Sequence, residues 1–231
     1  MKNNKGLLLI IAIVTLAQNI FFSSDDTYFS YYFALGYPLE NYEFAMLIYI
    51  VLTIGPIIFI SFYFSETIKK YTSGYGKLLL IRNYSKYKLF SKLCIKVAAE
   101  TVLIVLIQFS VYLVHNGELR PIGTEQIIRS VFTYGLGLIA MAYLQMLIEL
   151  FIDSTKAVII NSFYLLASYV SSFIVKSKVI RLFLFPSFMF GCENGALTSG
   201  NKYYISVLII TVWIAILFLC GNIKFKRTDI F

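Results

Sequence analysis

Six apolar stretches occupy most of this chain, and each is about as long as a helix that crosses a bilayer. A membrane-spanning helix needs roughly 20 apolar residues to cover a ~30 Å hydrocarbon core. The six stretches leave only short connections in a chain of 231 residues. We therefore predict a single all-α integral membrane domain over residues 1–231 with six transmembrane helices. They cover residues 7–22, 44–64, 97–114, 128–151, 157–175 and 203–221.

The composition agrees with a membrane protein and argues against a nucleic-acid partner. Hydrophobic residues make up 59% of the chain and charged residues only 14%, whereas a soluble domain carries about 25% charged residues. The net charge of +8 would suggest nucleic-acid binding in a soluble protein. In a membrane protein, lysine and arginine gather in cytoplasmic loops and face anionic lipid. We expect the lipid bilayer as a partner and no nucleic acid.

The charges between the apolar stretches predict which side of the membrane each connection occupies. With a cytoplasmic N-terminus, fourteen of the 20 basic residues fall on the cytoplasmic side, and acidic residues gather outside. This bias places both termini in the cytoplasm of a multi-pass protein of the cell membrane. The exceptions are Lys176, Lys178 and Arg181, which would lie outside. The first apolar helix is expected to remain uncleaved, because Ala17-Gln18-Asn19-Ile20 lacks a small-x-small cleavage site.

Two connections contain apolar segments that are too short to cross the membrane. Residues 177–190 are interrupted by Pro186 and end at Gly191, which predicts re-entrant or interfacial helices on the outer side between spans five and six. The long inner connection, residues 65–96, holds a short apolar patch followed by a basic amphipathic piece at 84–96. This piece is interpreted either as a basic interfacial helix that leads into span three or as a helix that docks into a partner's groove.

The inner connection resembles the first cytoplasmic loop of ABC-2 type transporter permeases, the six-span membrane subunits of bacterial ABC exporters. A glutamate follows span two, then come a glycine-containing turn, a small apolar helix ending in arginine, Ser85-Lys86, and a lysine at Lys92 or Lys96. The chain departs from the family pattern after the glycines, where Tyr75 and Lys77 replace the usual threonine. The resemblance implies a short cytoplasmic coupling helix at about residues 72–81. The implied coupling residues are Glu66, Thr72, Gly74, Gly76, Lys77, Leu78, Leu79, Leu80, Ile81 and Arg82.

The resemblance also implies partners and a substrate class. A permease of this family pairs with a second permease copy, so a homodimer is expected, together with two copies of an ABC ATPase. The size and composition are similar to those of Gram-positive exporters of amphipathic peptides, such as phenol-soluble modulins or lantibiotic-type bacteriocins. The implied function is export of toxin or antimicrobial peptides, or self-immunity against them.

The motifs missing from the sequence place any ATP hydrolysis in another subunit. The chain has no GxxxxGK[ST] phosphate loop, no HExxH zinc motif and no GxSxG nucleophile elbow. Its single histidine cannot build a two-histidine metal site. We therefore expect a protein that is not itself an enzyme and binds no cofactor or metal, with ATP and Mg²⁺ held by the partner subunit.

Polar residues inside apolar spans are the candidates for a transport pathway. Glu100 has a second interpretation, because Lys96 lies four residues earlier and the two can form a surface ion pair. In span four, Gly135, Gly137 and Ala140 form a small face that favours close helix packing. The pathway candidates are Gln18, Asn19, Glu100, Gln108, Gln145 and Asn161.

Two other classes of protein remain open from the sequence. The first is a non-transporting immunity or sensor protein whose basic inner loop binds lipid. The second is a secondary transporter, which is less favoured because such proteins have paired broken helices in both halves. The sequence shows one broken segment.

Overall fold

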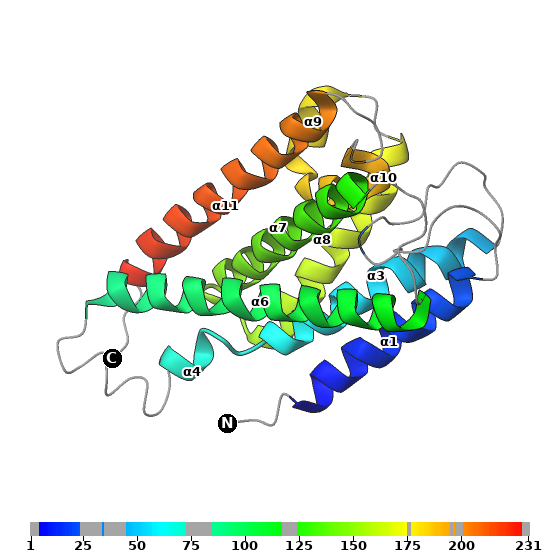
Figure 1. Cartoon of the computed structure of the whole chain (residues 1–231). Coiled ribbons are helices and arrows are strands. Elements are labelled where there is room, and N and C mark those ends of the chain that lie inside the picture. The colour runs from blue at the N-terminus through cyan, green and yellow to red at the C-terminus, as the bar shows by residue number, and fades with distance from the viewer. Residues whose placement is uncertain are drawn as a thin grey trace.

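Six long apolar helices pack side by side in the computed structural model of the chain (Figure 1). The structure describes residues 5–23, 34, 45–72, 85–116, 124–174, 177–194, 196 and 201–227, and within these ranges there is no strand. The long helices are α1 (Lys5–Ser23), α3 (Ala45–Phe64), α6 (Lys86–Asn116), α7 (Thr124–Glu149), α8 (Ser154–Ile174) and α11 (Asn201–Arg227).

Short helices mark two ends of this bundle. The helix α4 (Lys69–Thr72) lies near the start of α6 and the end of α11, which we call the α4 end (Figure 1). The elements α9 (Lys178–Phe183), η1 (Phe185–Met189) and α10 (Gly191–Asn194) lie near the start of α11, which we call the α9 end. Helices α1, α6 and α8 run away from the α4 end, whereas α3, α7 and α11 run toward it.

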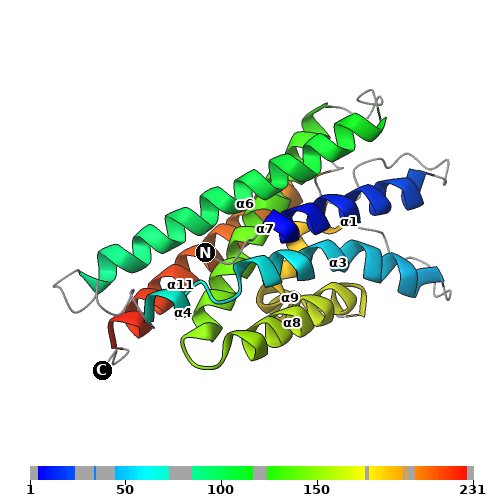
Figure 2. The same ribbon diagram turned by 90° about the horizontal axis from the view of Figure 1, so that it is seen from below.

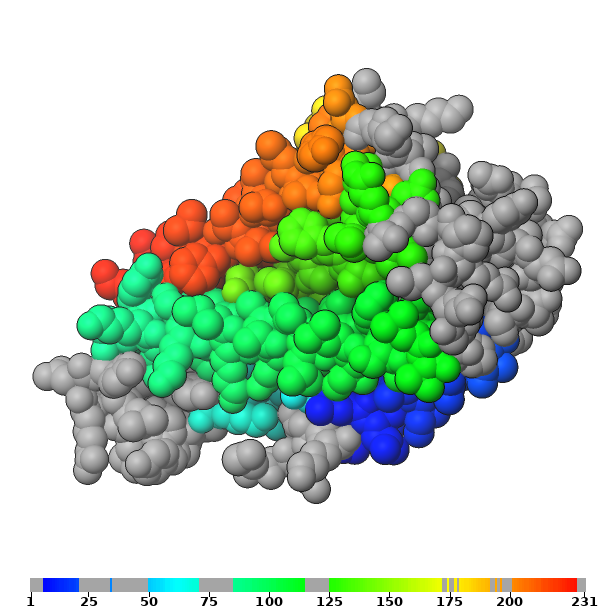
Figure 3. All heavy atoms as spheres, viewed as in Figure 1, coloured from blue at the N-terminus to red at the C-terminus, as the bar shows by residue number. Residues whose placement is uncertain are grey.

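Helix α7 is central, and α1 is peripheral. Helix α7 contacts α3, α6, α8, α10, α11 and η1, whereas α1 packs chiefly against α3 and α6. Figure 2 shows α1 between these two helices, and Figure 3 shows α6 as a continuous ridge between α11 and α1. Because α7 contacts so many elements, a movement of α7 would also displace its neighbours. The site described below includes the last residue of this helix.

Three of the described helices are long and apolar enough to cross a membrane, which indicates a membrane protein. They are Lys86–Val114, Glu125–Glu149 and Asn201–Arg227. Shorter apolar helices cover Gly6–Ile20 and Ile50–Phe64. The outward faces of the bundle carry leucine, isoleucine and valine, as on α11, where Ile205, Leu208 and Leu219 are exposed. Exposed aliphatic side chains on this scale are suited to lipid rather than to water.

One continuous helix replaces two segments expected from the sequence. Helix α6 begins at Lys86, so the basic amphipathic piece and the predicted span at 97–114 form a single helix. Its first turns carry a buried apolar stripe that includes Phe90. Phe90 packs on α11, where its ring centroid lies 5.5 Å from that of Phe225. A β carbon added at Gly221 would lie 2.5 Å from Phe90 Cζ, so the glycine permits this close approach.

The broken segment before α11 is buried among three long helices. Residues 185–190 of this segment are all buried, and η1 contacts α7, α8 and α11. Pro186 lies in the first turn of the 3-10 helix, as expected for a residue that has no backbone N–H to donate. Met189 lies against Gly137 of α7, where an added β carbon would come within 2.3 Å of Met189 Cβ. The predicted interruption is confirmed, and Gly137 serves close packing inside this chain.

Candidate functional site

A carboxylate from the central helix holds the turn that leads into α4. Glu149 is the last residue of α7. Its Oε1 accepts a hydrogen bond from the backbone N–H of Glu66 at 3.1 Å, and its Oε2 accepts one from the N–H of Ile68 at 3.4 Å. We call this arrangement the carboxylate clamp. Within the described residues, no Lys, Arg or His lies within ion-pair distance of Glu149, so these amide donors stabilise its charge.

The turn that the clamp holds has an unusual backbone. Glu66 has a φ of 63°, the only positive φ at a non-glycine residue in the described part of the chain. This left-handed conformation is unfavourable for a residue with a β carbon. It turns the chain sharply after α3, and the following turn is closed by hydrogen bonds such as Lys70 N–H to the Glu66 carbonyl at 3.1 Å. The clamp therefore stabilises a strained turn between α3 and α4.

The clamp continues into a buried network of amides. Gln145 lies one turn before Glu149 and donates from Nε2 to the Ser61 carbonyl at 2.9 Å and to Glu149 Oε1 at 3.4 Å. Asn161 of α8 donates from Nδ2 to Gln145 Oε1, Ser61 Oγ and the Met141 carbonyl, each at 3.4 Å. Side chains from α3, α7 and α8 thus meet at one point, which fixes the mutual position of these helices.

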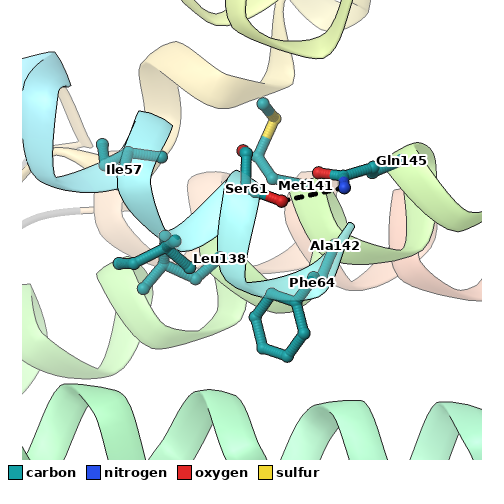
Figure 4. A pocket seen from close by; sticks show the side chains of 8 residues that line it. Ile57, Ser61, Phe64, Leu138, Met141, Ala142 and Gln145 are labelled. Carbon is teal, nitrogen blue, oxygen red and sulfur yellow. Dashed lines mark hydrogen bonds between the residues drawn. The ribbon is translucent and has the colours of Figure 1, made fainter. Parts of the chain in front are cut away.

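A small crevice lies beside this network, between α3 and α7 (Figure 4). Its polar groups come from Ser61 and Gln145, and Phe64 and Met141 contribute apolar walls. The space inside is about the size of one water molecule. A peptide cannot enter a crevice of this size, so in this conformation Gln145 and Asn161 act as structural groups.

The other pathway candidates divide into two kinds. Glu100 forms the predicted ion pair with Lys96, at 3.8 Å between Oε1 and Nζ, and both side chains are partly exposed. Gln108 is fully buried on α6 and donates from Nε2 to Thr15 Oγ1 at 3.4 Å. Gln18 and Asn19 are buried on α1. The structure brings Gln145 and Asn161 together near the α4 end, and it places Gln108 against α1.

Most of the predicted coupling residues lie outside the described part of the chain. Residues 73–84 are not described, and they include all of the coupling set from Gly74 to Arg82. Thr72 is the last residue of the short helix α4. Glu66 lies in the clamp, where its backbone N–H rather than its carboxylate makes the contact. The role of these residues in coupling remains a prediction.

Sequence reasoning missed the structural importance of Glu149 and Ser61. Glu149 was not among the candidate site residues, but it is partly buried and turned toward the backbone of Glu66 and Ile68. A sequence signal was present, since Gln145 and Glu149 are four residues apart and Met141 precedes Gln145 by four. Three residues at this spacing share one helix face, and Met141 and Gln145 are both buried.

No metal or disulfide contributes to this site in the described residues. No group of three or more His, Cys, Asp or Glu side chains there is arranged to hold a metal ion. Cys94 is buried and Cys220 is exposed, and both are free thiols. The hydroxyl of Tyr143 donates to the Cys94 carbonyl at 3.0 Å and adds another link between α7 and α6.

The fold and the site describe a helical membrane protein in which the turn after α3 is tied to the central helix α7. The chain belongs to the family described as "Protein of unknown function (DUF2705)", whose model matches residues 9–231. It is similar to "Uncharacterized protein YybK" of Bacillus subtilis (strain 168), with 24% identity over 250 aligned positions. That similarity covers 97% of this chain and 96% of the relative. No solved structure matches the chain.

Proposed function

We propose that this protein is the membrane-spanning permease subunit of an ATP-driven ABC exporter for amphipathic peptides. In this proposal six spans cross the cell membrane of a Gram-positive bacterium, with both termini in the cytoplasm. Two permease copies assemble with two ATPase subunits, which bind ATP and Mg²⁺. The resemblance of the inner connection to ABC-2 permeases supports the class, and the broken segment buried before α11 is in keeping with that family's outer hairpin.

The carboxylate clamp is the observation that carries the proposal. An ATPase that pulls on the inner connection needs a rigid link to the interior of the membrane domain. Glu149 provides such a link, because it joins the backbone of residues 66 and 68 to α7. Helix α7 contacts α3, α6, α8, α11 and the broken segment. A displacement of the turn would therefore be transmitted to most of the bundle rather than absorbed by a flexible loop.

The test is an ATPase assay on this chain purified with the ABC ATPase that the proposal expects to be encoded beside it. The complex is placed in nanodiscs and titrated with an amphipathic helical peptide, with Leu79→Asp beside the wild type. We expect peptide-stimulated hydrolysis in the wild type, and loss of both the stimulation and the bound ATPase in Leu79→Asp. Lys202→Asp serves as a control, because this exposed residue lies at the start of α11, at the α9 end of the bundle. If no ATPase co-purifies, or if the rate of ATP hydrolysis does not change with peptide concentration, the exporter proposal fails.

A second candidate is a non-transporting immunity or sensor protein whose basic inner surface binds lipid. Lys88, Lys92 and Lys96 favour it, because they recur every four residues on α6 and are exposed. Such a stripe is suited to anionic headgroups. This candidate predicts that the chain purifies without an ATPase and that replacing Lys88 and Lys92 by Gln weakens its retention of phosphatidylglycerol.

A further inference from the structure

Helix α1 turns a polar face toward the bundle. Thr15, Gln18 and Asn19 have exposed fractions of 0%, 0% and 2%, and they share a stripe with the buried Ile11. The opposite face carries exposed apolar side chains such as Leu9 and Ile13. A helix at the edge of a membrane bundle is expected to bury apolar or small residues, since polar groups in hydrocarbon need partners. We call the side chains of Gln18 and Asn19 the α1 amides.

The α1 amides lie at the same level as polar groups of two other helices. Thr15 accepts a hydrogen bond from Gln108 of α6, and Gln108 lies beside Tyr134 of α7. The α1 amides follow Thr15 by one helical turn toward the α9 end. Helix α7 runs in the opposite direction, so Ser130 also lies one turn beyond Tyr134 toward that end. The polar groups of α1, α6 and α7 therefore form one layer across the bundle.

The α1 amides lack partners that comparable amides have. The nitrogen and oxygen atoms of Gln18 and Asn19 make no hydrogen bond in the described part of the chain, and neither does Ser130 Oγ. By contrast, Gln145 Nε2, Gln145 Oε1 and Asn161 Nδ2 all make hydrogen bonds in the clamp network, and only Asn161 Oδ1 of these two side chains has no partner in the described residues. A buried amide without partners destabilises the protein around it. Such groups persist when a function requires them.

The side chains that form this layer carry no charge; they are Thr15, Gln18, Asn19, Gln108, Ser130 and Tyr134. Helix α3 has no charged residue, and α1 has none after Lys5. An amide offers one acceptor and two donors, which matches another amide or a hydroxyl group. An ammonium or carboxylate placed in the same position would lack a counter-charge in a medium of low dielectric constant. Uncharged polar groups are therefore the ligands that this layer can accommodate.

We propose that the α1 amides form a binding site for uncharged amide- and hydroxyl-bearing groups on the polar face of an amphipathic peptide. This inference rests on the proposed export function and specifies which peptides the permease accepts. The site is closed in this conformation, and it opens when α1 separates from α3 and α6. Helix α1 is suited to such a movement, since these two helices provide most of its contacts.

The test compares two pairs of nearly isosteric substitutions. Gln18→Met with Asn19→Leu removes the unpartnered amides, and Gln145→Met with Asn161→Leu removes the partnered ones. Each variant of the membrane chain, without an ATPase, is placed in nanodiscs, and its Tm is measured. Binding is followed with two fluorescent synthetic amphipathic helices, one with a Leu/Gln sequence and one with a Leu/Lys sequence.

We expect opposite results from the two pairs. The Gln18→Met, Asn19→Leu variant should have a Tm at or above that of the wild type, because removing unpaired buried amides is stabilising. It should bind the Leu/Gln helix about tenfold more weakly, which corresponds to losing one neutral hydrogen bond. The Gln145→Met, Asn161→Leu variant should have a lower Tm, because it removes amide nitrogens that make hydrogen bonds in the folded chain. The wild type should prefer the Leu/Gln helix to the Leu/Lys helix.

Three results would overturn the inference: the wild type fails to bind the Leu/Gln helix, it binds both helices equally, or the α1 variant loses stability while binding is unchanged. The last result would make the α1 amides structural. Because the binding arm uses no ATPase, it is independent of the exporter test. Failure of the ATPase assay with this binding pattern intact would overturn only the export function.

Discussion

Glu66 has a left-handed backbone just after the end of α3, and the hydrogen bond that its N–H donates to Glu149 compensates for the strain. Replacing Glu66 by Gly removes the β carbon that makes a φ of 63° unfavourable. We predict that Glu66→Gly raises the free energy of unfolding by about 1 kcal/mol, measured by denaturant unfolding in detergent. Glu66→Ala is the control, because it removes the carboxylate but keeps the β carbon. An equal increase in the free energy of unfolding in both variants would contradict the view that the strain comes from the backbone conformation of Glu66.

The clamp itself makes a prediction of the opposite sign. Glu149→Ala leaves two backbone N–H groups and the Gln145 amide short of an acceptor, so we expect a loss of about 1–3 kcal/mol of stability. Glu149→Gln keeps one acceptor oxygen and should lose less. Protease susceptibility of the 65–72 region provides a local measurement, and we expect it to rise in Glu149→Ala. An unchanged cleavage rate would show that the turn does not depend on the carboxylate.

Helix α7 contains two glycines whose surroundings differ sharply. A β carbon at Gly137 would lie 2.3 Å from Met189 Cβ and 3.4 Å from its Cα, so the buried 3-10 turn would have to move. We predict that Gly137→Ala costs about 1–3 kcal/mol. At Gly135 the nearest atom, Val105 Cγ2, is 3.9 Å away. Gly135→Ala should stabilise by up to about 1 kcal/mol through helix propensity.

Thermal unfolding in one detergent compares the two alanine variants directly. Both substitutions add the same methyl group to α7 and change its helix propensity equally. A difference between the two Tm values therefore reports the packing around Gly137. A similar effect of both substitutions would contradict the close packing of η1 on α7. The comparison also tests a feature on which the exporter proposal draws, because η1 is part of the broken segment and contacts α7, α8 and α11.

The whole molecule has two ends that the proposed topology assigns to opposite sides of the membrane. Lys156, in the first turn of α8, and Lys202, at the start of α11, are both exposed and lie at opposite ends of the bundle. In a chain without its three cysteines, we predict that Lys202→Cys reacts with a membrane-impermeant thiol reagent in intact cells. Lys156→Cys should react only after permeabilisation, because basic connections stay in the cytoplasm. Labelling of both residues from outside would overturn the topology.

The apolar stretches by themselves determined that the chain is helical, where its long helices lie, and that a broken segment precedes the last one. Helix α3 ends where the stretch at 44–64 ends, and Pro186 interrupts the segment as predicted. These properties are local, since each depends on a run of neighbouring side chains. The beginning of α6 was not predictable in this way. The stripe around Phe90 joins the span only because α11 covers it.

Only the tertiary structure decided which polar residues have partners. From the sequence, Gln18, Asn19, Gln145 and Asn161 were equivalent amides in apolar helices. Packing gives the last two a network with Ser61 and leaves the first two without hydrogen bonds in the described residues. The contact between Glu149 and Glu66 joins residues 83 positions apart. No local pattern encodes such a contact, because it depends on how separate helices come together in space.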